Sequence, residues 1–398
     1  MSGKPDQGSS LKSKGLFIPA LTGIRGVAAL WVVVHHCSGW ISQSLGMRNF
    51  ETASLVLNGF RAVDLFFILS GLILMLTHGE EFGARHSGNI KRFYILRMVR
   101  VYPLNTLILL AMVPFVLSQP DFVHWMRLYS TPAQAYKIHN LSWPGFFQSL
   151  FLVQTWTVLK LGEWNGPSWS LSAEVLGYLA FPFLAYRLLH VRNLVMLYTI
   201  AMGALGAEVL VLAVTHHLHD NPTGTMGALR MAGGFTGGMA LGRALTLTRE
   251  LGVKLPVSPT VAGGMILCAT LFVPALAPLM GFGFAWLLFG LAYEQSWLSR
   301  VLSAPLVMWW GRISFPFYLV HLILLKILVW SFLPDIHQNG VWVCFLYWSS
   351  YVAVTSSLAW VLHQWVERPS HRLAKRLAGP PGKGSVMASD EMRSLSAA

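Results

Sequence analysis

Two ionisable side chains stand eleven residues apart in the first apolar run of the chain, GIRGVAALWVVVHHC at residues 23–37. Eleven residues turn an α-helix through about three turns and advance it about 16 Å, so Arg25 and His36 share one helix face. Ionisable groups in a membrane-length segment are costly and normally have a function. A guanidinium suits an anion, and an imidazole suits proton transfer. The simpler alternative is a boundary arginine beside two packed histidines, His35 and His36.

The second apolar run, FRAVDLFFILSGLILML at residues 60–76, contains Asp64, with Ser70 deeper in. A carboxylate in hydrocarbon needs a partner. We expect His36, at a similar depth on the preceding antiparallel helix, to be that partner, because an aspartate fixes the tautomer of an imidazole and raises its basicity. The alternative is pairing of Asp64 with Arg61, one turn before it.

The connection after this run reads KRFYILRMVRVYP at residues 91–103. Arg97 and Arg100 are three residues apart on one helical face, and Lys91 and Arg92 precede them. Such a cluster suits a polyanion such as the phosphate groups of a nucleotide. The alternative is the ordinary excess of positive charge beside a membrane.

A third polar site opens the segment NGPSWSLSAEVLGYLAFPF at residues 165–183, where Ser170 and Glu174 are one helical turn apart. A glutamate one turn inside the membrane again indicates function. The alternative gives Ser170 the role of a helix cap and lets Glu174 interact with the helix dipole.

The segment GRISFPFYLVH at residues 311–321 carries Ser314, Tyr318 and His321 at spacings of four and three residues. These positions lie within about 40° of one another on a helix. Such a polar stripe must face protein or water. The alternatives are core packing for Tyr318 and a buried, hydrogen-bonded His321.

These side chains must be positioned by membrane-spanning helices, because 54% of the 398 residues are hydrophobic and only 11% are charged. Soluble domains carry about 25% charged residues. The sequence therefore predicts an all-α, polytopic membrane bundle of about ten transmembrane helices. The expected spans are 18–38, 60–78, 101–118, 169–186, 194–214, 228–245, 258–276, 279–293, 313–333 and 341–363. The shorter stretch 145–160 is expected to be interfacial or re-entrant.

The net charge of +13 is explained by membrane orientation and does not indicate a nucleic-acid partner. Most lysines and arginines fall on the side of the N-terminus, so both termini are expected to be cytoplasmic. We expect a cytoplasmic tail at residues 1–16, one membrane domain at 17–370, and a cytoplasmic, disordered tail at 371–398. The predicted location is a bacterial inner membrane, crossed several times.

Other polar groups carry weaker expectations. Glu208 and Arg230 are further intramembrane charges and candidates to pair with each other. The HHLHD stretch at 216–220 resembles a metal site in spacing but is expected to be a loop. The three cysteines (Cys37, Cys268 and Cys344) lie in apolar segments, which argues against disulfides and a zinc site, so no metal is expected.

The motifs, in this order, resemble those of the acyltransferase-3 family of integral membrane acyltransferases, which includes bacterial polysaccharide and lipopolysaccharide O-acetyltransferases. The resemblance covers residues 17 to 370. The matching elements are Arg25 and His36 separated by ten residues, VDLFFILSG at 63–71, Arg97-x-x-Arg100-x-x-Pro103, Trp169-Ser170-Leu171 with Glu174, ISFPFYLVH at 313–321, and ERP at 367–369. The chain departs from the family pattern at Phe315 and Pro316, where an aromatic Ser-Tyr step is commoner.

The resemblance implies that an acyl group, most often acetyl, moves from a cytoplasmic thioester to a hydroxyl. It assigns acyl-CoA binding to Arg97 and Arg100, with Arg92 and Arg25. His36 would take the acceptor's proton, a step worth about 10²–10⁴-fold in rate, and Asp64 would orient its ring. Transfer through an acyl-histidine intermediate stays open as an alternative, and Cys37 is a less favoured acyl carrier.

Glu174, as a third catalytic residue, and an aromatic-rich outer segment would bind the acceptor, expected to be a glycan or lipid-linked sugar. Supporting roles fall to Ser70, Trp169, Ser170, Ser314, Tyr318 and His321. No bound cofactor is expected, and acetyl-CoA is a co-substrate. Two alternatives stay open: acylation of a small lipid or glycoside, and proton-coupled transport.

Overall fold

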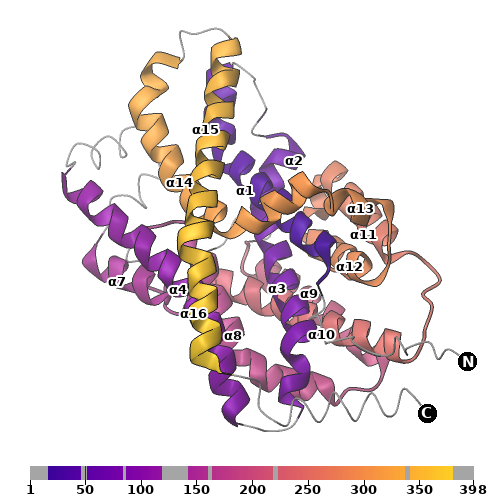
Figure 1. Ribbon diagram of the computed structural model, residues 1–398. Helices are drawn as coiled ribbons and strands as arrows, with labels where there is room; N and C mark the ends of the chain where they lie inside the picture. The colour runs from indigo at the N-terminus through magenta and orange to yellow at the C-terminus, as the bar shows by residue number, and fades with distance from the viewer. Residues whose placement is uncertain are drawn as a thin grey trace, which may run out of the picture.

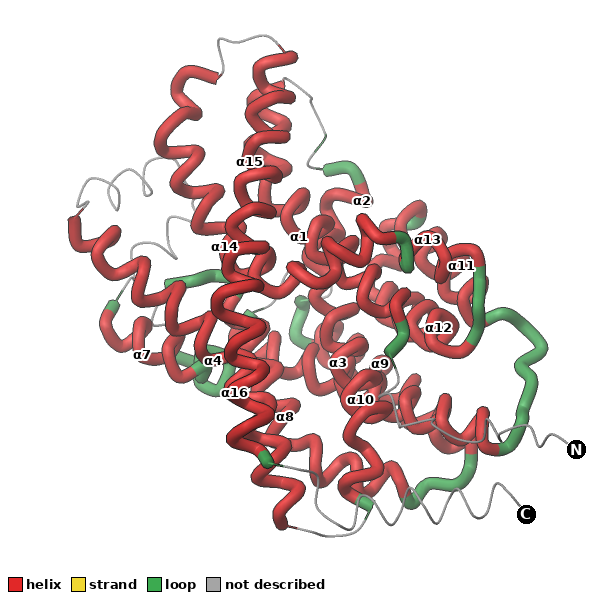
Figure 2. Tube along the Cα trace, viewed as in Figure 1, coloured by secondary structure: helices red, strands yellow, loops and turns green. Residues whose placement is uncertain are grey.

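The computed structural model describes residues 17–379 except 46–49, 51, 84–86, 119–141, 160–163, 218–222 and 337–340. Within these residues the chain is helical and contains no strand (Figure 2). The long helices are α1 (Pro19–Leu45), α3 (Ala62–His78), α4 (Ser87–Ser118), α8 (Ser168–Leu189), α9 (Leu194–Val214), α10 (Gly224–Glu250), α14 (Pro305–Ile336) and α15 (Val341–Leu362). The shorter ones are α2 (Ser54–Leu57), α7 (Trp143–Phe151), α11 (Pro259–Phe272), α12 (Met280–Tyr293), α13 (Trp297–Leu302) and α16 (Arg368–Ala378). The 3₁₀ turns η1 (Asn58–Arg61), η2 (Gly79–Phe82) and η3 (Pro274–Leu279) and the π-helical turn η4 (His363–Glu367) connect some of them.

The all-helical class predicted from composition is confirmed, and the number of membrane spans is confirmed in part. Among the described residues, seven helical segments are long and apolar enough to cross a membrane. They coincide with seven of the ten predicted spans. The other three predictions fall on α8, α10 and the 14-residue α11, which are helices outside that set. The protein is therefore a multi-pass membrane protein, and spanning by these three helices stays a prediction.

Several helices begin at a side chain that accepts a hydrogen bond from a free backbone N–H of the first turn. Ser142 accepts from Gly145 at the start of α7, and Asn193 accepts from Met196 at the start of α9. Serine and asparagine are favoured at these positions because four N–H groups there lack helical partners. The predicted re-entrant stretch contains only the nine-residue α7, which ends at Leu152 in the left-handed region with φ of 55°.

Glycines allow two pairs of helices to approach closely. Between α3 and α10, a Cβ atom at Gly238 would lie 2.0 Å from the carbonyl oxygen of Ile68. Between α1 and α14, a Cβ at Gly311 would lie 2.0 Å from the carbonyl oxygen of Thr22. Helices in membranes pack by such small residues because lipid supplies no hydrophobic drive. The second crossing holds the Arg25 and His36 face of α1 against α14.

The last helices form a continuous column, α15, η4 and α16, which runs past the other helices, and α16 packs against α4 (Figure 1). Ser370 and Ala374 are buried on α16. Residues 371–378, the first part of the predicted tail, are therefore helical, and α4 covers one face of this helix. Residues 1–16, 380–398 and part of the HHLHD stretch lie outside the described residues.

Candidate active site

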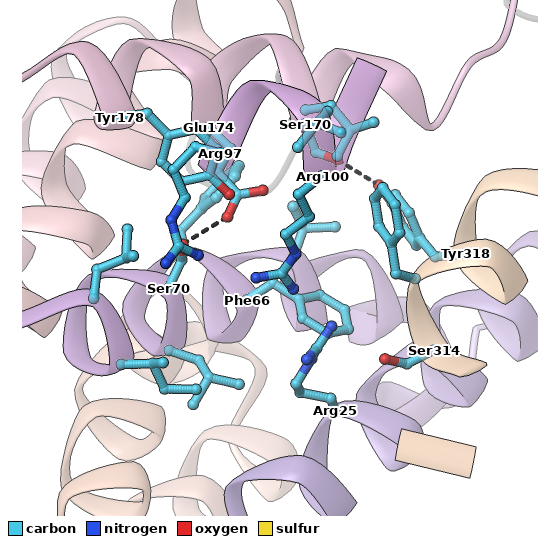
Figure 3. Close-up of a pocket in the computed structure, with 18 residues that line it drawn as sticks. Arg25, Phe66, Ser70, Arg97, Arg100, Ser170, Glu174, Tyr178, Ser314 and Tyr318 are labelled. Carbon is cyan, nitrogen blue, oxygen red and sulfur yellow. Dashed lines mark hydrogen bonds between the residues drawn. The ribbon is translucent and has the colours of Figure 1, made fainter. Parts of the chain in front are cut away.

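One cavity of about 140 Å³ gathers most of the polar side chains singled out in the sequence. Its polar lining comes from α1, α3, α4, α8 and α14: Arg25, Ser70, Arg97, Arg100, Ser170, Glu174, Tyr178, Ser314 and Tyr318. The apolar wall includes Phe66 and Phe315. Figure 3 shows Arg25 and Arg100 pointing toward one another across this cavity, with Arg97 beside Ser70 and Glu174.

The spacings that suggested shared faces are confirmed. Arg97 and Arg100, three residues apart on α4, both line the cavity, as do Ser170 and Glu174, four residues apart on α8. Ser314 and Tyr318 line it from α14. Five separate helices therefore contribute polar side chains to the same cavity.

The charges around the cavity do not balance. Among the described lining residues there are three guanidinium groups and one carboxylate, that of Glu174. Glu174 Oε1 accepts a 2.6 Å hydrogen bond from the Ser70 hydroxyl. Arg97 contacts His78 through Nη2 at 2.5 Å and lies over the Phe93 ring. In a low-dielectric interior this excess of positive charge favours an anion, because guanidinium groups are planar, multiple donors to phosphate.

Tyr318 and Ser170 line one wall of the cavity. The Tyr318 hydroxyl and the Ser170 hydroxyl are 3.0 Å apart, and Tyr318 also donates to the Pro167 carbonyl at 3.3 Å (Figure 3). The ring centroid of Phe66 lies 6.1 Å from that of Tyr318. Phe66 and Tyr318 therefore form the aromatic part of this wall.

His36 and His321 form a pair beyond this wall. Their ring centroids are 5.1 Å apart, and His321 Nε2 lies 3.3 Å from His36 Nδ1. His321 is fully buried, and its ring centroid is 5.7 Å from that of Tyr318. The face of α1 that carries Arg25 and His36 is thus turned toward α14 and not toward lipid. His36 does not line the cavity itself; Tyr318 and His321 lie between.

Asp64 is not placed as the sequence suggested. Its carboxylate pairs with Arg230 on α10, at 3.0 Å from Nε and 2.7 Å from Nη2. The step of six residues from Asp64 to Ser70 turns the helix by about 600°, which leaves the two side chains about 120° apart. Because Ser70 faces the cavity, Asp64 faces α10 instead. The expectation that Asp64 orients His36 is corrected here, because its carboxylate contacts Arg230 instead. Pairing of Arg230 with Glu208 stays a prediction, and the two groups interact electrostatically.

Arg92 also lies outside the cavity lining. Its guanidinium pairs with Glu81, at 3.0 Å from Oε2, and faces the Gly379 carbonyl at 3.4 Å. Five residues separate it from Arg97, a rotation of about 140° on a helix. The predicted fourth phosphate-binding arginine is therefore a link between α4, η2 and the end of α16.

Trp169 is a packing residue in this structure. It is 6% exposed, its ring meets that of Phe67 edge-on at 6.1 Å, and the Arg230 guanidinium lies over it at 5.6 Å. Trp164, from the aromatic-rich segment, is equally buried and packs on Phe146. Neither ring presents a face to an acceptor sugar.

Comparison with known proteins fixes the class. A family model described as an acyltransferase domain matches residues 18–364. The chain belongs to this acyltransferase family. The resemblance stated from the motifs is therefore confirmed, and the protein is an acyltransferase.

Its curated relatives include several acyltransferases. Acyltransferase MdmB from Streptomyces mycarofaciens is 28% identical over 345 residues, which is 78% of this chain and 79% of the relative. Peptidoglycan O-acetyltransferase OatA from Listeria monocytogenes is 25% identical over 380 residues, 89% of this chain and 56% of the relative. O-acetyltransferase OatA from Staphylococcus aureus is 23% identical over 205 residues, 50% of this chain and 30% of the relative. The chain thus spans about half of the Listeria relative, and no solved structure matches it.

The lining residues that the sequence analysis did not single out include Tyr178 and Phe66. Tyr178 lies one turn after Glu174 on α8, a spacing that places both on one face. Phe66 lies four residues before Ser70 on α3 in the same way. The described residues hold no cluster of metal ligands, and the three cysteines are free, with Cys37 and Cys344 buried.

Proposed function

We propose that this acyltransferase moves an acetyl group from acetyl-CoA to a hydroxyl of a cell-surface or exopolysaccharide sugar, in a bacterial inner membrane. The observation that carries the proposal is the cavity whose described lining brings Arg25, Arg97 and Arg100 together with one carboxylate, that of Glu174. A donor made inside the cell and rich in phosphate matches this charge.

The size of the cavity limits what it holds. About 140 Å³ has room for roughly five water molecules, enough for a phosphate group or part of the pantetheine arm and too little for the whole coenzyme. We therefore assign one phosphate-bearing section of the donor to Arg97 and Arg100, with the remainder outside. This assignment requires the arginine end to face the cytoplasm, as positive charge does in inner membranes.

The thioester would then extend past Ser314 toward Tyr318 and the histidine pair. Because Tyr318 and Phe66 form the aromatic wall there, the acyl carbon must pass Tyr318 to reach His36. The face shared by Arg25 and His36 spans about 16 Å along α1. An extended pantetheine arm is of that order of length.

At His36 the reaction is a direct transfer in this proposal. The acceptor oxygen bonds to the thioester carbonyl carbon while its proton passes to His36. The carbon–sulfur bond then breaks, and the CoA thiolate takes that proton to leave as the thiol. General-base help of this kind contributes about 10²–10⁴-fold in rate.

The proposed acceptor is a glycan or lipid-linked sugar on the opposite side of the membrane. The support is the similarity to the Listeria relative, which is named a peptidoglycan O-acetyltransferase. Trp143 and Trp156 are 51% and 39% exposed, in contrast to Trp164, and stacking on sugar rings is the role we propose for them.

The test uses purified full-length protein with acetyl-labelled acetyl-CoA and a glycan acceptor fraction. Release of CoA with label on the glycan supports the proposal, and His36→Ala should lower the rate by about 10²–10⁴-fold without lowering protein level. His190→Ala, at the exposed end of α8, is the matched control. Full turnover by His36→Ala overturns the mechanism. Label on a lipid or small glycoside, or proton-coupled uptake without CoA release, would favour one of the alternatives.

A further inference from the structure

The tautomers of the two facing histidines are fixed by backbone carbonyl groups. His36 Nδ1 lies 2.9 Å from the carbonyl oxygen of Val32, one turn earlier on α1. His321 Nδ1 lies 2.5 Å from the carbonyl oxygen of Tyr318 on α14. A carbonyl oxygen only accepts hydrogen bonds, so each Nδ1 must carry hydrogen.

The contact between the rings then has one consistent direction. In neutral His321, hydrogen on Nδ1 leaves the lone pair on Nε2. That nitrogen faces His36 Nδ1 at 3.3 Å. The His36 Nδ1–H is therefore shared between the Val32 carbonyl and His321 Nε2. The opposite direction would place a His36 lone pair against the Val32 carbonyl oxygen, which is repulsive.

We propose that His321 is the positioning residue of His36 and takes the place that a carboxylate has in a Ser-His-Asp triad. His321 Nε2 accepts from His36 Nδ1–H, which makes His36 Nε2 the nitrogen that receives the acceptor's proton. When His36 becomes an imidazolium, the same contact stabilises its charge until the proton passes to the thiolate. This inference rests on the proposed function, because it assumes that His36 is the base.

The surroundings hold His321 in this orientation. It is fully buried, and Tyr351 on α15 donates a 2.9 Å hydrogen bond to its backbone carbonyl. Asp64, the alternative partner for His36, is engaged by Arg230. Three helices thus fix one imidazole against another, and His321 links the histidine pair to Tyr318 in the cavity wall.

Substitutions of His321 can distinguish the roles of its two ring nitrogens. A glutamine places its amide near the position of Nε2 and can accept from His36, whereas an asparagine places its amide near Nδ1 and cannot reach it. We expect His321→Asn and His321→Leu to lower kcat by about 10²-fold or more, as wrong-tautomer variants of triads do. The KM for acetyl-CoA should stay within about twofold, and His321→Gln should recover at least about tenfold of the lost kcat.

A double-variant cycle completes the test. If His321 acts through His36, then His36→Ala combined with His321→Asn should be no slower than His36→Ala alone. Equal kcat values for the Gln and Asn variants, or a further loss in the double variant, overturn the inference. Full activity of His36→Ala overturns the proposed function instead. The comparison of His321→Gln with His321→Asn tests the inference even if His321→Leu fails to fold.

Discussion

Arg230 on α10 holds the carboxylate of Asp64 on α3 by two contacts, Nε at 3.0 Å and Nη2 at 2.7 Å from Oδ1. Both side chains are buried, and the Arg230 guanidinium also lies over the rings of Phe60 and Trp169. The pair ties together two helices that meet at Gly238. It is a structural contact about 120° around α3 from the cavity.

Asp64→Asn should therefore destabilise the protein without changing its chemistry. Glu208 interacts with the same guanidinium, so the loss should stay below the roughly 3 kcal/mol of a buried guanidinium left with no carboxylate. Arg230→Gln in the same chain should restore part of it. Thermal unfolding in detergent measures the loss. The kcat of the folded fraction should stay near that of the unaltered protein. If Asp64→Asn unfolds at the normal temperature but loses turnover, Asp64 acts in catalysis after all.

Arg97→Ala and Arg100→Ala should each weaken CoA binding by about 10- to 100-fold, because each removes charged hydrogen-bond donors from a buried site. Equilibrium binding of CoA to purified protein measures this. Arg187→Ala is the control, since Arg187 lies over the Phe183 ring at the exposed end of α8. Arg92→Ala should behave like the control in binding. Unchanged affinity in both cavity variants would rule out the assigned phosphate site.

Glu174→Gln should tighten the binding of free CoA severalfold, because it removes the one negative charge from the described lining of an anion site. The amide oxygen can still accept the hydrogen bond of Ser70, so the helices should stay in place. Isothermal titration compares it with Glu80→Gln, an exposed position. Weaker CoA binding would show instead that the carboxylate holds the arginines in their working geometry.

Gly311→Ala should lower both stability and turnover. The new methyl carbon would lie 2.0 Å from the Thr22 carbonyl oxygen, so α1 and α14 must separate and the histidine pair with them. Overpacking of this kind costs about 1–3 kcal/mol. Gly206→Ala is the matched control on α9, where nothing lies within 4 Å of the added carbon. The unfolding temperature and kcat of Gly206→Ala should both be unchanged. Equal behaviour of the two variants would show that the close crossing of α1 and α14 does not position the histidine pair.

Helix periodicity was enough to predict which residues share a face. Arg97 with Arg100, Ser170 with Glu174, and Ser314 with Tyr318 each line the cavity together. The same arithmetic places Asp64 away from Ser70, and Arg92 away from Arg97. Depth in the membrane had suggested Asp64 as a partner of His36, and closeness in sequence had grouped Arg92 with Arg97; the structure places both side chains away from the cavity lining.

Helix periodicity could not predict which residues contact each other between helices. Ser70 and Glu174 are 104 residues apart, and Asp64 and Arg230 are 166 apart. Nothing in the local pattern tells which of several buried charges will meet. The close crossing of α1 and α14 depends on glycines whose neighbours are distant in the chain, so the pairing of His36 with His321 required the folded structure.

The unequal charge around the cavity has a consequence for how long the protein lasts. Three like charges held together repel one another, so a bound polyanion strengthens the same fold that binds it, by an amount that grows with its concentration over its dissociation constant. At a high concentration of coenzyme the protein would be more stable, and at a low concentration it would unfold and be degraded more easily. The concentration of the donor would thereby affect the amount of folded enzyme as well as its rate of turnover.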